Sequence, residues 1–217
     1  HLRAICFDLD GLLLDTEQTY RDGWLPAFEK MGIDQSAYDL DAWSGLSWLQ
    51  TRKILEAAFG AARVAEIREV RETYILQQMT EGQIPVKAGA LEVLQVAKKK
   101  SLKLAVVSST VSSRGLPLLE NAGLLTCFDV KIFGDEVMKH KPLPDPYLTA
   151  LSKLGVHEFQ AIAVEDSLPG ALSATQAGLK VFLVPDCSFD KVFPDADLTQ
   201  LNLFGIGKDL HELADMI

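Results

Sequence analysis

Cysteine is scarce in this chain: Cys6, Cys127 and Cys187 are the three cysteines among 217 residues. They are widely spaced and form neither a CxxC pair nor a Cys/His cluster, which excludes a structural zinc site of the usual spacing. A small, odd number of scattered cysteines also argues against a disulfide framework and is typical of a reducing compartment. We therefore expect a cytoplasmic protein.

Long apolar runs and an excess of basic residues are also missing. No uninterrupted apolar stretch approaches the roughly 18 residues that a membrane-spanning helix requires. The chain has 21 Lys and Arg residues against 30 Asp and Glu residues, a net charge of −9. It therefore lacks the clustered positive charge with which proteins bind nucleic acid or anionic lipid. We expect no nucleic-acid partner, no membrane partner and a monomeric chain.

Apolar residues, by contrast, make up 48% of the chain and gather in short segments of strand length. The five candidate strands are residues 2–7, 103–107, 130–133, 161–164 and 181–184. A helical pattern at 87–100 precedes the second candidate strand. Further helical patterns, at 113–122, 144–154 and 168–177, lie between the later strands. Strands that are apolar on both faces and alternate with helices predict an α/β fold with a doubly wound parallel sheet.

An insertion lies between the first predicted strand and the first core helix. Residues 16–82 contain only helical periodicity, at 17–31, 47–59 and 61–81. We interpret them as an α-helical cap domain inserted into a catalytic core made of residues 1–15 and 83–217. The insertion leaves the sheet at its carboxyl edge, where α/β proteins bind their ligands, so we expect it to act as a lid over an active site.

Polar side chains mark the ends of the first four predicted strands and the loops that follow them. They are Asp8, Asp10, Ser108, Ser109, Lys141, Glu165 and Asp166. Because parallel strands end at the same edge of a sheet, we expect these side chains to converge on one pocket.

This set of side chains predicts phosphoryl transfer. Clustered carboxylates repel one another unless a hard cation with oxygen ligands lies between them, which indicates Mg²⁺ and a phosphate substrate. Asp8 is the candidate nucleophile, forming an aspartyl-phosphate, and Asp10 is the candidate acid and base. We assign phosphate binding to Ser108, Ser109 and Lys141.

Each of these elements alone has a plainer interpretation. An Asp-x-Asp-Gly segment is most often a turn, a Ser-Ser-Thr segment is most often a loop and helix cap, and a lysine before proline is most often a surface residue. Their occurrence at successive strand ends favours the catalytic interpretation.

The order of these motifs resembles the haloacid dehalogenase superfamily, in particular its beta-phosphoglucomutase-like phosphatases with a helical cap. The motifs that carry the resemblance are DLDGLLLDTE at 8–17, VVSS at 106–109, KPLPDPY at 141–147 and VEDS at 164–167. The resemblance implies a Rossmann-like core and a cap at 16–82. It also implies a Mg²⁺ ion bound by Asp8, the Asp10 backbone carbonyl and Asp166, with Glu165 assisting.

We therefore expect a Mg²⁺-dependent phosphomonoesterase that hydrolyses a small sugar phosphate or nucleoside monophosphate. Dehalogenases of the superfamily need neither a second Asp nor a metal, so Asp10 and the acidic pair at 165–166 disfavour that activity. A hexose-phosphate mutase of the beta-phosphoglucomutase type is the main alternative. The mutase's cap histidine and arginine correspond here to Tyr20 and Trp48, which favours hydrolysis. Arg52 or Lys53 is the alternative cation for a second phosphate, so the mutase stays an open hypothesis. A catalytically silent binding protein on the same fold is the third hypothesis.

Substrate choice is expected to lie in the cap. The candidate recognition residues are Glu17, Tyr20, Trp24, Trp48 and Arg52. The aromatic rings suit stacking on a sugar or a base, and Arg52 offers a cation for a remote anionic group. Packing in the core of a small helical domain is the alternative role for the aromatic residues.

Overall fold

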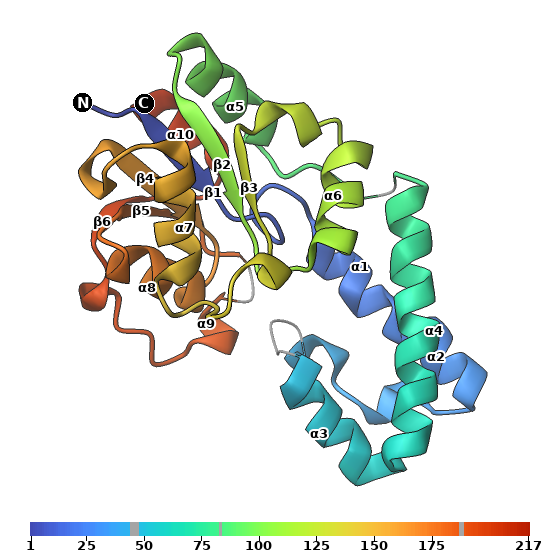
Figure 1. The fold of residues 1–217 in the computed structure, drawn as a ribbon. Coiled ribbons are helices and arrows are strands. Elements are labelled where there is room, and N and C mark those ends of the chain that lie inside the picture. Colours follow the sequence, from blue (N-terminus) through green and yellow to red (C-terminus); the bar gives the residue numbers. More distant parts are fainter. Residues whose placement is uncertain (44–47, 83, 187–188) are drawn as a thin grey trace.

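A parallel sheet lies at the centre of the protein (Figure 1). The structure is a computed structural model that describes residues 1–43, 48–82, 84–186 and 189–217. The strands are β1 (Ala4–Phe7), β2 (Lys103–Val107), β3 (Val130–Ile132), β4 (Ala161–Glu165), β5 (Lys180–Leu183) and β6 (Leu203–Ile206). Their order is β3-β2-β1-β4-β5-β6, and all neighbours pair in parallel. The predicted α/β fold with a doubly wound parallel sheet is confirmed.

Helices cover both faces of this sheet (Figure 1). One face carries α5 (Ala90–Lys99), α6 (Ser112–Asn121) and α10 (Leu210–Met216), and the other carries α7 (Asp145–Leu154) and α8 (Leu168–Gln176). The alternation of side chains along a strand produces the two layers. In β1, Ile5 and Phe7 belong to one apolar cluster, and Ala4 and Cys6 belong to the other.

Short elements connect these helices and strands. They are α9 (Phe189–Val192) and the 3₁₀ turns Gln35–Ala37, Leu40–Trp43, Leu125–Cys127, Gly134–Glu136, Glu158–Gln160 and Leu198–Gln200. Among the described residues, no helix is both long enough and apolar enough to cross a lipid bilayer.

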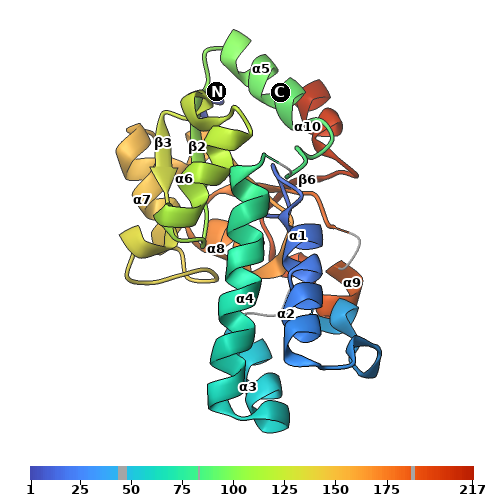
Figure 2. The same ribbon diagram turned by 90° about the vertical axis from the view of Figure 1, so that its right-hand side faces the viewer.

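Four helices extend away from the sheet in the region of the predicted insertion (Figures 1 and 2). They are α1 (Thr16–Asp22), α2 (Trp24–Met31), α3 (Trp48–Phe59) and α4 (Ala61–Thr80). Helices α2, α3 and α4 share an apolar cluster of their own, which contains Phe28, Leu55 and Ile67. Ile75 and Met79, near the end of α4, pack into a cluster on the sheet instead. Helix α4 therefore contributes both to the cluster that it shares with α2 and α3 and to a cluster on the sheet. The domain division at residues 16 and 82 stays a prediction.

The secondary structure differs from the sequence prediction in two places. The helix expected at 17–31 is divided at Gly23, where a Cβ would lie 3.0 Å from Cγ of Arg71. The missing side chain lets α4 pack closely at this point. The prediction also omits the helices and the strand after β5, which are α9, β6 and α10. Strand β6 lies at the sheet edge, is only partly buried, and contains Gly205, which packs against the ring of Phe182.

Candidate active site

The chain turns sharply after β1, and the turn brings two strand ends together. Gly11 has a φ of 78°, a left-handed conformation that costs a residue with a Cβ roughly 1–2 kcal/mol. A Cβ at Gly11 would also lie 2.3 Å from Oδ2 of Asp166. Glycine thus allows the segment that follows Asp8 to approach the end of β4.

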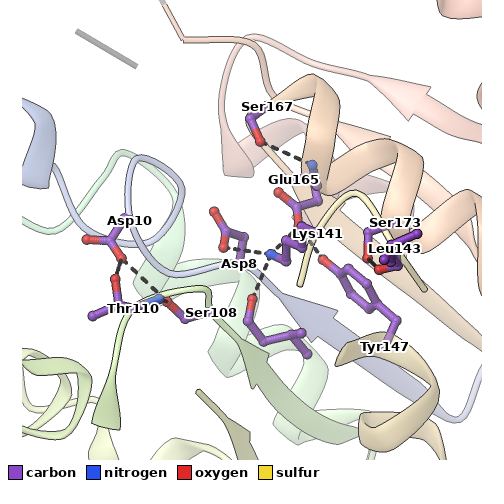
Figure 3. A network of polar contacts seen from close by, with 12 residues as sticks. Asp8, Asp10, Ser108, Thr110, Lys141, Leu143, Tyr147, Glu165, Ser167 and Ser173 are labelled. Carbon is purple, nitrogen blue, oxygen red and sulfur yellow. Dashed lines mark hydrogen bonds and ion pairs between the residues drawn. The ribbon is translucent and has the colours of Figure 1, made fainter. Parts of the chain in front are cut away.

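Lys141 connects the ends of three strands (Figure 3). Its Nζ donates to Oδ1 of Asp8 at 2.9 Å, to Oε1 of Glu165 at 2.6 Å and to the backbone carbonyl of Val107 at 2.8 Å. Burial alone would lower the pKa of this lysine, but the charges of Asp8 and Glu165 outweigh burial and raise the pKa above its ordinary value. Lys141 is therefore a fixed, protonated cation beside Asp8.

Three carboxylates, from Asp8, Glu165 and Asp166, offer oxygen atoms within 4.8 Å of one another. Burial, and then the charges of Asp8 and Glu165, raise the pKa of Asp166 well above its ordinary value. Burial and Asp8 also raise the pKa of Glu165, against the opposing effect of Lys141. Oε2 of Glu165 is buried without a hydrogen-bond partner in the described part of the chain. A buried group of carboxylates with a free oxygen fits a hard divalent cation such as Mg²⁺.

Asp10 is held apart from this acidic cluster by hydroxyl groups (Figure 3). In Figure 3, its Oδ2 accepts from Thr110 at 2.6 Å and from Ser108 at 3.5 Å. Its Oδ1 accepts a hydrogen bond from the hydroxyl of Tyr20 at 2.7 Å. The carboxylate does not belong to the group formed by Asp8, Glu165 and Asp166. A contact of Asp10 with a bound metal would therefore use the backbone carbonyl.

A cleft of about 880 Å³ lies between the strand ends and the helical insertion. The predicted core residues that line it are Asp8, Asp10, Ser108, Ser109, Lys141 and Asp166. Glu165 lies behind them, fully buried and bonded to Lys141. The structure thus brings together all of the side chains predicted at the strand ends.

Three of the predicted recognition residues, Glu17, Tyr20 and Trp24, line the same cleft from the insertion side. Burial, and then a hydrogen bond with Asp186, raise the pKa of Glu17 to about 8. Trp24 is only 4% exposed and packs edge-on against Trp43, with 5.3 Å between the ring centroids. Trp24 therefore serves the core of the insertion as well as the cleft wall.

Arg52 lies outside the lining of this cleft. Its Nε donates to Oε1 of Glu56 at 2.6 Å within α3, and it lines a neighbouring hollow of about 460 Å³ between α3 and α4. Trp48 is the first residue of α3, but its side chain lies outside the part of the chain that the structure describes. The recognition roles of both residues stay predictions.

Two hydroxyl groups near the cleft have contacts that the sequence analysis did not assign. Thr110 donates to Asp10, and the fully buried Tyr147 donates to Oε1 of Glu165. Thr110 directly follows the predicted phosphate-binding serines, and Tyr147 closes the lysine motif. Their positions in the sequence could therefore have drawn attention to them.

Arg71 is a cation of the cleft that the sequence analysis did not find. Its guanidinium lies 4.2 Å from the ring centroid of Trp24 and donates to the backbone carbonyl of Tyr20 at 2.7 Å. Burial, and then the charge of Arg114, lower the pKa of Arg71 to about 10. Helix α4 contains Arg63, Arg68 and Arg71, and no motif distinguishes Arg68 and Arg71, which line the cleft, from Arg63.

Comparisons with known proteins agree with this geometry. The family described as haloacid dehalogenase-like hydrolase matches residues 5–184. The chain is 32% identical over 196 residues to Protein CbbY of Rhodobacter capsulatus, covering 85% of this chain and 86% of that protein. It is 29% identical over 187 residues to a Phosphorylated carbohydrates phosphatase of Thermotoga maritima, covering 82% of this chain and 83% of that protein.

A solved structure of CbbY from Rhodobacter sphaeroides in complex with phosphate matches with a TM-score of 0.74 and 27% identity. The match covers 98% of this chain and 96% of that one. The family match spans most of the chain, from β1 to the residue after β5. This chain is therefore an enzyme that belongs to the haloacid dehalogenase-like hydrolase family, as the order of its motifs predicted.

Proposed function

We propose that this enzyme is a Mg²⁺-dependent phosphomonoesterase that hydrolyses a small sugar phosphate or nucleoside monophosphate through an aspartyl-phosphate. The observation that carries the proposal is the position of Lys141, which bridges Asp8 and Glu165 beside the carboxylate of Asp166. One relative is named a phosphorylated carbohydrates phosphatase, and the CbbY structure contains phosphate, which supports a phosphorylated small molecule as the substrate.

In the first step, Asp8 is the nucleophile. A carboxylate oxygen of Asp8 forms a bond to phosphorus, and the bond between phosphorus and the ester oxygen breaks. Asp10 gives its proton to the departing alcohol. Lys141 holds Asp8 in place through its hydrogen bond to Oδ1.

In the second step, a water molecule attacks the phosphorus atom of the aspartyl-phosphate. Asp10 accepts the proton of the water, and the bond between phosphorus and Asp8 breaks. Inorganic phosphate leaves, and both carboxyl groups return to their starting states. Ser108, Ser109 and Lys141 would contact the phosphoryl oxygens in both steps.

The metal and the insertion complete the proposal. A divalent cation held by Asp8, Glu165, Asp166 and the Asp10 backbone carbonyl would offset the negative charge of the phosphoryl group. Tyr20 and other side chains of the insertion line the cleft and would exclude bulk water during the first step. We place the enzyme in the cytoplasm, a reducing compartment that suits the free thiols of Cys6 and Cys127. We also propose that it acts as a monomer.

The direct test is the release of inorganic phosphate from a panel of sugar, polyol and nucleoside monophosphates. We expect release that needs Mg²⁺, stops with a chelator, and is absent from Asp8→Asn. Release by Asp8→Asn at the wild-type rate would contradict the mechanism. If no ester is hydrolysed, isomerisation of glucose 1-phosphate with a bisphosphate primer would indicate the mutase, and inactivity there as well would favour a binding protein.

A further inference from the structure

Tyr147 places a polar group inside an otherwise apolar layer. The residue lies near the start of α7, is 0% exposed, and packs in the cluster that includes Cys6, Val107 and Leu151. Its hydroxyl donates a hydrogen bond to Oε1 of Glu165 (Figure 3). A buried hydroxyl costs free energy unless it is hydrogen-bonded, and phenylalanine would fill the same apolar space without that cost. We therefore expect the hydroxyl to have a role in holding the carboxylate of Glu165 through this hydrogen bond.

The two oxygens of Glu165 have different surroundings. Oε1 accepts from both Lys141 and Tyr147, whereas Oε2 is buried and accepts from no group in the described chain. The start of α8 lies close to the whole carboxylate, because a Cβ at Gly170 would lie 2.1 Å from Oε2 and 2.4 Å from Oε1. Because Oε1 accepts from two donors and Oε2 from none in the described chain, Oε2 is the oxygen of Glu165 left for a cation.

Lys141 alone would not define the orientation of Glu165. Its ammonium group is shared with Asp8 and with the carbonyl of Val107, so it is a common cation for several acceptors. The hydroxyl of Tyr147 has Glu165 as its acceptor, and the phenol ring is held rigidly by the surrounding apolar layer. The rigid donor is therefore the group suited to fix the carboxylate.

We propose that Tyr147 is a positioning residue for the metal site: it holds Oε1 of Glu165 so that Oε2 remains directed to the divalent cation. The inference rests on the proposed function, because that function supplies the cation. Hydrogen bonds that orient metal ligands typically contribute about 10–100-fold to metal affinity. A single phenol hydroxyl is expected to act at the lower end of this range.

The first test is a titration with Mn²⁺, which takes the same oxygen ligands as Mg²⁺. The electron paramagnetic resonance signal of the free ion measures how much Mn²⁺ is bound. Tyr147→Phe should weaken Mn²⁺ binding about tenfold, while the matched control Tyr38→Phe, in the insertion, should bind like the wild type. Equal binding by Tyr147→Phe and wild type would overturn the inference and leave the proposed function intact. Failure of the wild type to bind Mn²⁺ would overturn both.

A second measurement uses the unaltered chain, in case Tyr147→Phe does not fold. Tyrosine labelled with ¹³C at the hydroxyl-bearing carbon gives one signal for each of the 4 tyrosines. Tyr→Phe substitutions at 20, 38 and 74 assign three signals and, by elimination, that of Tyr147. Mg²⁺ should shift the Tyr147 signal and leave that of Tyr38 unchanged. A Tyr147 signal that does not respond to Mg²⁺ would contradict the inference.

Discussion

The hydroxyl of Tyr20 on α1 donates a hydrogen bond to Oδ1 of Asp10 at 2.7 Å. Burial, and then the charge of Asp10, raise the pKa of Tyr20 above its ordinary value, so the phenol stays neutral and remains a donor. Tyr20 belongs to the helical insertion, whereas Asp10 belongs to the loop after β1. The insertion therefore helps to hold the side chain that we propose as the acid and base.

Tyr20→Phe should lower kcat roughly fivefold to tenfold, since one neutral hydrogen bond contributes about 1 kcal/mol. The effect is limited because Thr110 continues to donate to Asp10. Steady-state kinetics under saturating Mg²⁺ measure the change, with Tyr38→Phe as the control for loss of a phenol elsewhere in the insertion. An unchanged kcat would show that the Tyr20 contact does not position Asp10 during the reaction.

The site in the core could be predicted from the sequence because it depends on topology. Parallel strands end at one edge of the sheet, so residues such as Asp8 and Asp166 must converge wherever the strands are identified correctly. Strand β6 was not predicted from the sequence. It is a short edge strand that is only partly buried, and Gly205 interrupts its apolar residues.

The insertion side of the cleft could be predicted only in part. Glu17 and Tyr20 directly follow a motif, and both line the cleft. Which arginines of these helices face the cleft depends instead on how α3 and α4 pack. Arg52 pairs with Glu56 on its own helix, and Arg71 lies against Trp24. Helical periodicity alone does not distinguish these two cases.

Gly11 and Gly32 offer a matched pair of substitutions. Both have a left-handed φ, at 78° and 64°, so alanine should cost roughly 1–2 kcal/mol of stability at either position. A Cβ at Gly32 meets nothing within 4 Å, whereas a Cβ at Gly11 would meet Oδ2 of Asp166. Calorimetric titration with Mg²⁺ should therefore show binding lost in Gly11→Ala and retained in Gly32→Ala. Similar Mg²⁺ affinity in the two variants would place the metal away from Asp166.

Asp166→Asn should stabilise the metal-free protein. Burial and the charges of Asp8 and Glu165 all act against an ionised Asp166, so a neutral amide removes an unfavourable charge. In the presence of a chelator, we expect the Tm to rise by roughly 2–6 °C. Mg²⁺ should raise the Tm of the wild type and have little effect on the variant.

The exposed Asp195 provides the control for that experiment, because Asp195→Asn removes a carboxylate outside the acidic cluster. Its Tm should match that of the wild type with and without Mg²⁺. A lower Tm for Asp166→Asn than for the wild type in chelator would contradict the account of repulsion in the cluster.

Arg71→Met should raise KM roughly 10- to 100-fold, because the hydrogen bonds that Arg71 would donate to an anionic group of the substrate contribute about 1.5–3 kcal/mol. Arg71 lines the cleft, and it forms no ion pair with another described residue. Arg52→Met is the matched control, since Arg52 pairs with Glu56 outside the cleft lining. A larger rise in KM for Arg52→Met would reverse the assignment of the two arginines.

The covalent intermediate on Asp8 is the central claim, and trapping it is the most direct measurement. Acetyl phosphate labelled in its phosphoryl group has a leaving group that needs little help from an acid, so Asp10→Asn should still form the aspartyl-phosphate but hydrolyse it slowly. After acid quenching, we predict a hydroxylamine-sensitive label on the peptide that contains Asp8, in Asp10→Asn and not in Asp8→Asn. Label that persists in Asp8→Asn, or its absence from Asp10→Asn while the wild type releases phosphate, would contradict the mechanism.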